Sequence, residues 1–223
     1  SLRHQLRVVD VHREGPGVVS VVCKGRGLER LAIGGGQFFE WRFLAPGMWW
    51  QAHPFSVSAR PKPPFVRLTV KDVGDFSAAL RHLRPGTPVA IEGPYGSFTH
   101  HARTTTKALL IAGGIGVTAV RALLEDLPKD ADPVVVLRAT REEDLVLRGE
   151  VAELTRRRRG RVHELVGPRS NVRLDRELTS LVPDLVQRDV FVAGPPGFVQ
   201  RVVRLVGRLG VPDDAIHFEE FAL

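Results

Sequence analysis

The segment "KALLIAGGIGVTAV", residues 107–120, decides the fold of this chain. A continuous apolar run predicts a buried strand, glycines follow at Gly113, Gly114 and Gly116, and a helical pattern begins near Thr118. Glycines let the backbone approach a pyrophosphate, and a helix N-terminus offers free N–H groups to an anion. Such a turn can also serve packing alone, but the order of strand, turn and helix favours nucleotide binding.

The rest of the C-terminal half continues this alternation of strand and helix. Strand patterns cover 107–114, 133–140, 161–167 and 188–194, and helical patterns cover 118–127, 147–158 and 198–210. Alternating strands and helices predict a doubly wound parallel sheet that binds ligands at the carboxyl ends of its strands.

The N-terminal half has a different period. Apolar residues alternate with polar ones in short runs separated by Gly and Pro, at 5–12, 17–25, 36–44, 53–59, 65–71 and 87–93. This pattern predicts an antiparallel barrel or sandwich, interrupted by one helix over 75–83. The polar stretch at 100–107 is the expected boundary, which gives domains of 1–103 and 104–223.

Composition restricts the kind of chemistry. The chain has 223 residues, 43% of them hydrophobic and 26% charged, which is a globular balance. Its single cysteine, Cys23, excludes an internal disulfide, an iron–sulfur cluster and a structural zinc site, so redox chemistry requires an organic cofactor. Cys23 is expected to pack in a strand. The adjacent His100 and His101 do not easily present two ligands to one metal, so no metal site is expected.

The net charge of +7 suits phosphate-rich cofactors, nucleic acid or anionic lipid. No basic groove interleaved with aromatic residues is visible, and Tyr95 is the only tyrosine, so nucleic acid is not an expected partner. No apolar run approaches the roughly 20 residues that cross a bilayer. The chain begins at Ser1 without a methionine, which suggests a piece of a longer protein.

Two segments of the N-terminal half allow two interpretations each. In "AHPFSVSA", residues 52–59, the plain interpretation is a half-buried strand with Phe55 and Val57 facing the core and Ser56 and Ser58 facing water. In "VKDVGDFSAAL", residues 70–80, a helix begins at a glycine with a lysine just upstream. That helix end is either a second anion site or an ordinary capped helix.

Six motifs in order carry a resemblance over essentially the whole chain: "HPFSVSA", "VKDVGDFS", "EGPYGSF", "AGGIGVT", "AGPPGF" and "IHFEEF". Together they resemble the ferredoxin–NADP reductase superfamily, most of all the cytosolic dehydrogenase part of ferric reductases and NADPH oxidases. The resemblance implies FAD in a Greek-key antiparallel β-barrel and a nicotinamide dinucleotide in the α/β domain. It also implies hydride transfer where the two domains meet.

For the barrel domain, the resemblance places Phe55 near the isoalloxazine ring and the Ser56 hydroxyl near its N5 atom. The wider superfamily prefers arginine and tyrosine where this chain has His53 and Phe55, whereas the ferric reductase branch uses a histidine and a phenylalanine. The stretch from Gly74 to Ser77 matches the segment that takes the flavin pyrophosphate, and "EGPYG" matches a turn bordering the flavin. The implied flavin-binding residues are His53, Pro54, Phe55, Ser56, Val70, Lys71, Gly74, Phe76 and Ser77.

For the α/β domain, the resemblance implies two nucleotide-binding loops, formed by Gly113, Gly114, Gly116 and Thr118 and by Gly194, Pro195 and Pro196. Ala193 replaces a cysteine and Ala119 a proline that are usual in the family. The missing cysteine, which lies near the nicotinamide, puts the efficiency of hydride transfer in doubt.

The tail "IHFEEFAL", residues 216–223, matches a segment that covers the flavin, so Glu219 and Phe221 join Ser56 as expected catalytic residues. The tail can also be read as a last strand of the sheet.

The segment "LRATREED", residues 137–144, follows a strand where the resemblance expects the adenine ribose. Arg138 and Arg141 can pair with a 2′-phosphate, whose charge suits arginine forks. Glu142 and Glu143 oppose this assignment. The balance favours NADPH, with NADH use possible.

The sequence therefore predicts a reductase module that takes hydride from NAD(P)H onto FAD and passes single electrons to an acceptor. The resemblance implies that the acceptor is haem in a transmembrane part of a longer protein, with this module on the cytoplasmic face of an anionic membrane. Two alternatives remain: a free-standing ferredoxin-type reductase, and a flavin-binding regulatory subunit with little turnover, which Ala193 keeps open.

Overall fold

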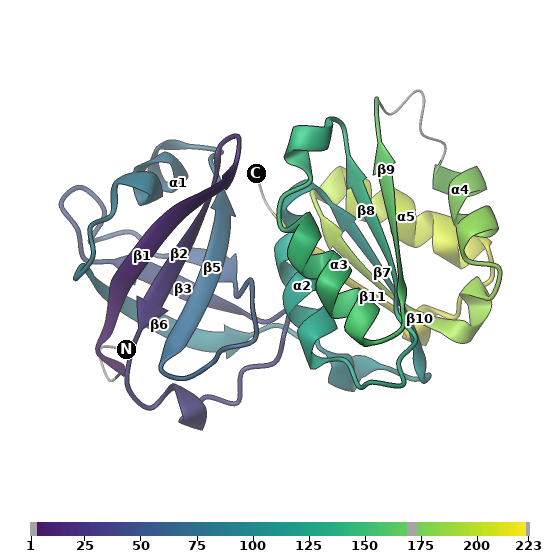
Figure 1. The fold of residues 1–223 in the computed structure, drawn as a ribbon, viewed down its shortest axis with the longest axis horizontal. Coiled ribbons are helices and arrows are strands. Elements are labelled where there is room, and N and C mark those ends of the chain that lie inside the picture. Colours follow the sequence, from purple (N-terminus) through teal and green to yellow (C-terminus); the bar gives the residue numbers. More distant parts are fainter. Residues whose placement is uncertain (1–3, 169–173, 222–223) are drawn as a thin grey trace.

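The computed structural model describes residues 4–168 and 174–221, which form two sheets side by side (Figure 1). The first sheet is antiparallel and has the order β4-β3-β6-β1-β2-β5. Its strands are β1 (Leu6–Gly15), β2 (Val18–Lys24), β3 (Phe38–Phe43), β4 (His53–Ser56), β5 (Phe65–Lys71) and β6 (Pro88–Tyr95). The bridge between Val57 and Leu68 joins the two ends of this order, so the sheet closes into a barrel.

Apolar residues that alternate along the strands fill the barrel. Phe39, Trp41 and Phe43 on β3 are each 1% exposed or less, and Cys23 is fully buried as expected. Burial raises the pKa of the Cys23 thiol to about 12, which keeps it protonated and unreactive. The helix predicted over 75–83 is α1 (Asp75–Ala79) followed by a single 3₁₀ turn (Leu80–His82).

The second sheet is parallel and has the order β11-β10-β7-β8-β9, as the alternating pattern predicts. Its strands are β7 (Lys107–Gly113), β8 (Val134–Ala139), β9 (Arg161–Val166), β10 (Arg188–Gly194) and β11 (Ile216–Glu220). The helices are α2 (Val117–Asp126), α3 (Arg148–Arg157), α4 (Leu174–Leu181) and α5 (Pro196–Arg208). Within the described ranges, no helix is long and apolar enough to span a membrane.

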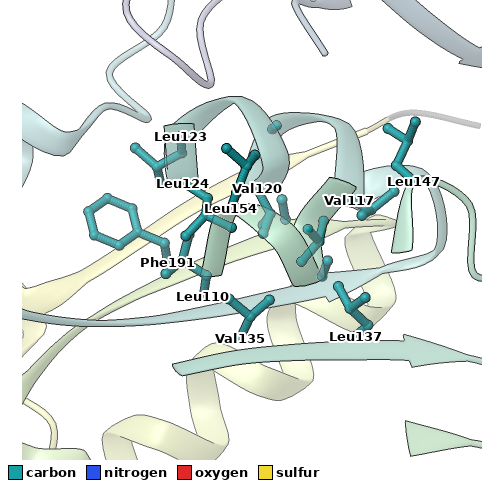
Figure 2. Packing of buried hydrophobic residues seen from close by; sticks show 14 of the residues in the cluster. Leu110, Val117, Val120, Leu123, Leu124, Val135, Leu137, Leu147, Leu154 and Phe191 are labelled. Carbon is teal, nitrogen blue, oxygen red and sulfur yellow. The ribbon is translucent and has the colours of Figure 1, made fainter. Parts of the chain in front are cut away.

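The helices cover both faces of this sheet. Leu110, Val135 and Phe191 pack under α2 and α3 (Figure 2), whereas Ile111 and Val192 face α4 and α5. The neighbouring strands β7 and β10 therefore lead into helices on opposite faces. This divergence opens a crevice at their carboxyl ends, where doubly wound sheets bind ligands.

Helix α2 packs against the barrel. The amide of Gly35 donates a 2.5 Å hydrogen bond to Asp126, and a Cβ atom at Gly35 would overlap the carbonyl of Ala122. The guanidinium of Arg67 on β5 donates two hydrogen bonds, of 2.8 and 2.9 Å, to the carboxylate of Glu150 on α3. Close backbone packing and this two-pronged ion pair hold the two domains together.

Candidate functional site

A cavity of about 610 Å³ lies where the barrel meets the carboxyl edge of the parallel sheet. Strands β4 and β5 and helix α1 form most of its wall, and the loop before α2 and the end of β11 complete it. It brings together twelve of the predicted site residues: His53, Pro54, Phe55, Ser56, Val70, Lys71, Gly74, Phe76, Ser77, Thr118, Glu219 and Phe221.

Ser56 presents a polar atom that no other described group satisfies. Its side chain is 4% exposed, and its hydroxyl has no hydrogen-bond partner within the described ranges although it lines the cavity. An unsatisfied buried hydroxyl costs about 1–3 kcal/mol. The hydroxyl is therefore suited to a polar ligand atom.

The plain interpretation of this segment, in which Ser56 and Ser58 face water, is wrong. Ser58 is fully buried and accepts hydrogen bonds from Thr69 at 2.8 Å and from Arg67 at 3.0 Å. Closure of the barrel explains the difference, because the end of β4 folds onto β5 and covers the face that an isolated half-buried strand would leave in water.

Aromatic rings form one wall of the cavity. The rings of His53 and Phe76 stack with centroids 3.9 Å apart, and Phe55 lies nearly parallel to Phe76 at 6.2 Å. Phe38 also lines the cavity and contacts the ring of Tyr95. Parallel rings beside an orphaned hydroxyl suit a flat heteroaromatic ligand with polar edges.

At the start of α1, the side chain of Ser77 binds backbone groups of the same turn. The Ser77 hydroxyl accepts hydrogen bonds from the amides of Val73 and Gly74, at 2.9 and 3.1 Å, and donates to the Gly74 carbonyl. The capped-helix interpretation of this segment is therefore correct in its geometry. Gly74 leaves open space where a side chain would stand, so its backbone stays accessible from the cavity.

The C-terminal segment forms the last strand of the parallel sheet and also reaches the first cavity. Strand β11 pairs with β10, and the amide of Phe221 donates a 2.9 Å hydrogen bond to the carbonyl of Gly194. Glu219 and Phe221 also line the cavity, while Ala222 and Leu223 lie outside the described residues. Burial raises the pKa of Glu219 to about 7, so this carboxyl can gain or lose a proton near neutral pH.

A second cavity, of about 690 Å³, lies along the carboxyl ends of β7, β8 and β10. Gly113, Gly114 and Pro195 line it, and Lys71 lines both cavities. Gly114 has a φ of +53° and nothing within 4 Å of where its Cβ would be, so its backbone is open to a ligand.

Three other loop residues have packing roles. A Cβ atom at Gly116 would overlap the Ala193 carbonyl, and one at Gly194 would crowd Gly113 and Phe198. Pro196 is the first residue of α5, where the lack of an N–H group costs no hydrogen bond. Gly116 and Gly194 thus let the two loops approach each other, and none of the three residues lines either cavity.

The two predicted arginines differ in position. Arg138 lines the second cavity, and its guanidinium donates to the carbonyls of Leu165 and Gly167. Arg141 is 63% exposed, forms ion pairs with Glu143 and Asp144, and is not among the lining residues. Of the two acids that opposed the assignment in the sequence, Glu143 thus pairs with Arg141, whereas Glu142 pairs with Arg148.

Sequence reasoning missed several residues of the two cavities. Phe38, Thr69 and Ile115 line the first cavity from β3, β5 and the glycine turn. Arg201, Arg204 and Arg208 line the second from α5. Their spacing of three and four residues puts these arginines on one helix face, a signal that the sequence does contain.

A family model described as an FAD-binding domain matches residues 7–99. The chain is 26% identical over 185 residues to the glycine betaine monooxygenase reductase subunit of Pseudomonas aeruginosa, a match that covers 75% of this chain. The chain spans about half the length of that relative (50%). It is 29% identical over 188 residues to ferredoxin–NADP reductase B of Sorangium cellulosum, covering 75% of this chain and 77% of the relative.

The fold is similar to a solved structure over nearly its whole length. The FAD/NAD-binding domain of nitric oxide dioxygenase from Vibrio cholerae aligns with a TM-score of 0.77 and 22% identity, covering 98% of each chain. The arrangement of the two sheets is thus a known fold.

Proposed function

We propose that this chain is an NAD(P)H-dependent reductase module of the ferredoxin–NADP reductase superfamily that binds FAD in the cavity beside Ser56. FAD, when bound, supplies the redox chemistry, because its ring accepts hydride from the nicotinamide and releases electrons one at a time. The acceptor is a one-electron centre on another domain or protein.

One observation carries this proposal: two cavities of dinucleotide size share a wall at Lys71. The larger aromatic surface belongs to the first cavity, where an orphaned hydroxyl faces the space, which fits the flat polar ring of a flavin. Gly113, Gly114 and Pro195 of the two loops line the second cavity, which fits a pyrophosphate. Two dinucleotides bound in this way would meet at the domain junction.

Different residues of the first cavity would contact different parts of FAD. His53, Phe55 and Phe76 would bound a flat ring, and Ser56 would donate a hydrogen bond to its polar edge. Gly74 would offer its backbone to the flavin phosphates, with Lys71 as the charge partner. Glu219 would hold or release a proton at the wall that the α/β domain contributes.

The experiment follows NADPH oxidation by purified, FAD-loaded protein with a one-electron dye as acceptor. The proposal expects a yellow protein with steady turnover that requires both FAD and the dye. A protein that binds FAD yet does not oxidise NADPH would be the regulatory subunit instead, and Ala193 is the residue to restore to cysteine in that case. Equally tight binding of FMN would contradict the assignment of the dinucleotide flavin.

For the acceptor, we infer haem in a membrane part of a longer protein. Support comes from "HPFS" at 53–56, which resembles the ferric reductase branch, and from the charge of +7, which suits an anionic cytoplasmic membrane face. The relatives named above favour a second candidate, a soluble ferredoxin or oxygenase component. The coding sequence upstream of Ser1 separates the two candidates. Membrane helices encoded there support haem as the acceptor, whereas a gene that begins near Ser1 supports a soluble carrier.

A further inference from the structure

Helix α5 presents three arginines on one face and carries no acidic residue. Arg201, Arg204 and Arg208 fall within a stripe about 60° wide at 3.6 residues per turn. The sequence contains no Asp or Glu between Asp189 and Asp213. No carboxylate on this helix can therefore neutralise the stripe.

These arginines face the second cavity without a partner. All three line it and are exposed, and none makes a hydrogen bond or ion pair with another residue in the ranges 4–168 and 174–221. By contrast, Arg156 and Arg157 on α3 bind Glu153 at 2.9 and 2.8 Å. These two arginines of α3 thus have a carboxylate partner, and the α5 stripe has none within the same ranges.

The position of the stripe relative to the glycine loops indicates its ligand. Helix α5 begins at Pro196, beside the loop that contains Pro195. At 1.5 Å per residue, Arg201 and Arg204 lie about 7.5 and 12 Å further along the axis, and helical side chains lean back toward the N-terminus. A phosphate bound by Arg201 and Arg204 would thus lie beyond a pyrophosphate held at the loops.

Arg208 has a simpler explanation. It lies in the last turn of α5, where the helix dipole favours a cation. This leaves Arg201 and Arg204 as the two cations that the helix itself does not explain. Two acids, Asp144 and Asp175, also line this cavity, and Asp144 is already paired with Arg141, which lowers its pKa.

We propose that Arg201 and Arg204 recognise the 2′-phosphate of NADPH, together with Arg138 at the end of β8. This assignment deepens the proposed function and rests on it. Arginine forks match phosphate oxygens in geometry and charge, whereas NADH has no group at this position. Arg141 does not take part, because its two ion pairs hold it outside the cavity.

Calorimetric binding of 2′,5′-ADP and 5′-ADP to the FAD-loaded protein tests the assignment without turnover. The wild type is expected to prefer 2′,5′-ADP, and Arg201→Ala with Arg204→Ala is expected to remove roughly tenfold or more of that preference while leaving 5′-ADP binding nearly unchanged. Lysine at both positions should restore part of the preference. Arg156→Ala with Arg157→Ala removes the same net charge away from the cavity and should change nothing.

The outcomes separate the inference from the function that it deepens. Equal binding of the two nucleotides to the wild type, or an unchanged preference in the Arg201 and Arg204 variant, overturns the inference and leaves a nicotinamide-dependent reductase in place. Binding of neither nucleotide to the wild type overturns the proposed function as well.

Discussion

Ser56 is a buried serine that lines the first cavity. Alternation along β4 and closure of the barrel bury it, yet its hydroxyl remains without a partner in the described part of the chain. Folding tolerates such a group where a ligand satisfies it. Its neighbour two positions on, Ser58, is satisfied by Thr69 and Arg67, so the two serines of "FSVS" have different roles.

Ser56→Ala is expected to bind FAD almost normally, because the ring and phosphate contacts remain, and to slow hydride transfer by roughly 5 to 150-fold. This range corresponds to about 1–3 kcal/mol for a hydrogen bond that strengthens in the transition state. Rapid mixing of each FAD-loaded variant with saturating NADPH measures it. Ser58→Ala is the control and should affect stability more than rate; a normal rate in Ser56→Ala would remove the hydroxyl from the mechanism.

Glu219 should make stability depend on pH. Its pKa is about 7 in the fold against 4.5 normally, so the native state holds the proton more tightly than the unfolded chain. The stabilisation linked to this proton is complete below pH about 4.5 and is lost as pH rises through 7. Glu219→Gln should therefore gain about 1–3 kcal/mol relative to wild type between pH 4.5 and 8. Parallel curves from denaturant unfolding would contradict the assignment.

At the scale of elements, the order of apolar and polar residues along the chain predicts most of the strands. Period-two alternation located all six barrel strands, because a strand buried on one face has apolar residues at every second position. Continuous apolar runs located β7, β8 and β10, because a strand buried on both faces is apolar throughout. Helix α4 was not predicted, since eight residues with only Leu178 fully buried give little periodicity. The stack of His53 on Phe76 was also beyond prediction, because it depends on how β4 and α1 meet in space.

The arginines show the same limit. Proximity to a strand end made Arg141 a candidate, but local acids bind it in the fold. The α5 arginines resemble any solvated helix face until the sheet order places them beside the glycine loops.

One buried carboxylate binds residues 104 and 105, which lie in the segment between the two sheets. Asp189 on β10 is fully buried and accepts hydrogen bonds from the amides of Thr104 and Thr105, at 2.9 and 2.5 Å, and from His217 at 2.9 Å. Asp189→Ala should lower the free energy of unfolding by about 2–4 kcal/mol, because buried donors lose their acceptor. The exposed Asp214→Ala should change it by less than about 0.5 kcal/mol. Equal losses in the two variants would show that the network is not needed.

At the scale of the whole molecule, function depends on how the two domains are held. The Arg67–Glu150 pair joins the barrel to α3, and Arg121 of α2 donates a further 2.7 Å hydrogen bond to Glu150. Both carboxylate oxygens are therefore used at the junction. This arrangement joins the barrel to both α2 and α3.

A double-mutant cycle with Arg67→Ala and Glu150→Ala should give a coupling of about 1–3 kcal/mol in the free energy of unfolding. Each single variant should also slow flavin reduction at saturating NADPH without weakening FAD binding. The cycle of Arg157→Ala with Glu153→Ala, an exposed pair within α3, should give less than about 0.5 kcal/mol. Additive effects at Arg67 and Glu150 would mean that the domains are positioned by packing alone.

The central claim is that two dinucleotides meet at the domain junction and exchange a hydride there. Anaerobic rapid mixing of FAD-loaded wild-type protein with NADPH tests it most directly, by following the yellow absorbance of the flavin. The account predicts full bleaching in a single turnover, at a rate that saturates with NADPH and falls in Ser56→Ala. Flavin that stays yellow at saturating NADPH, with occupancy confirmed, would contradict it.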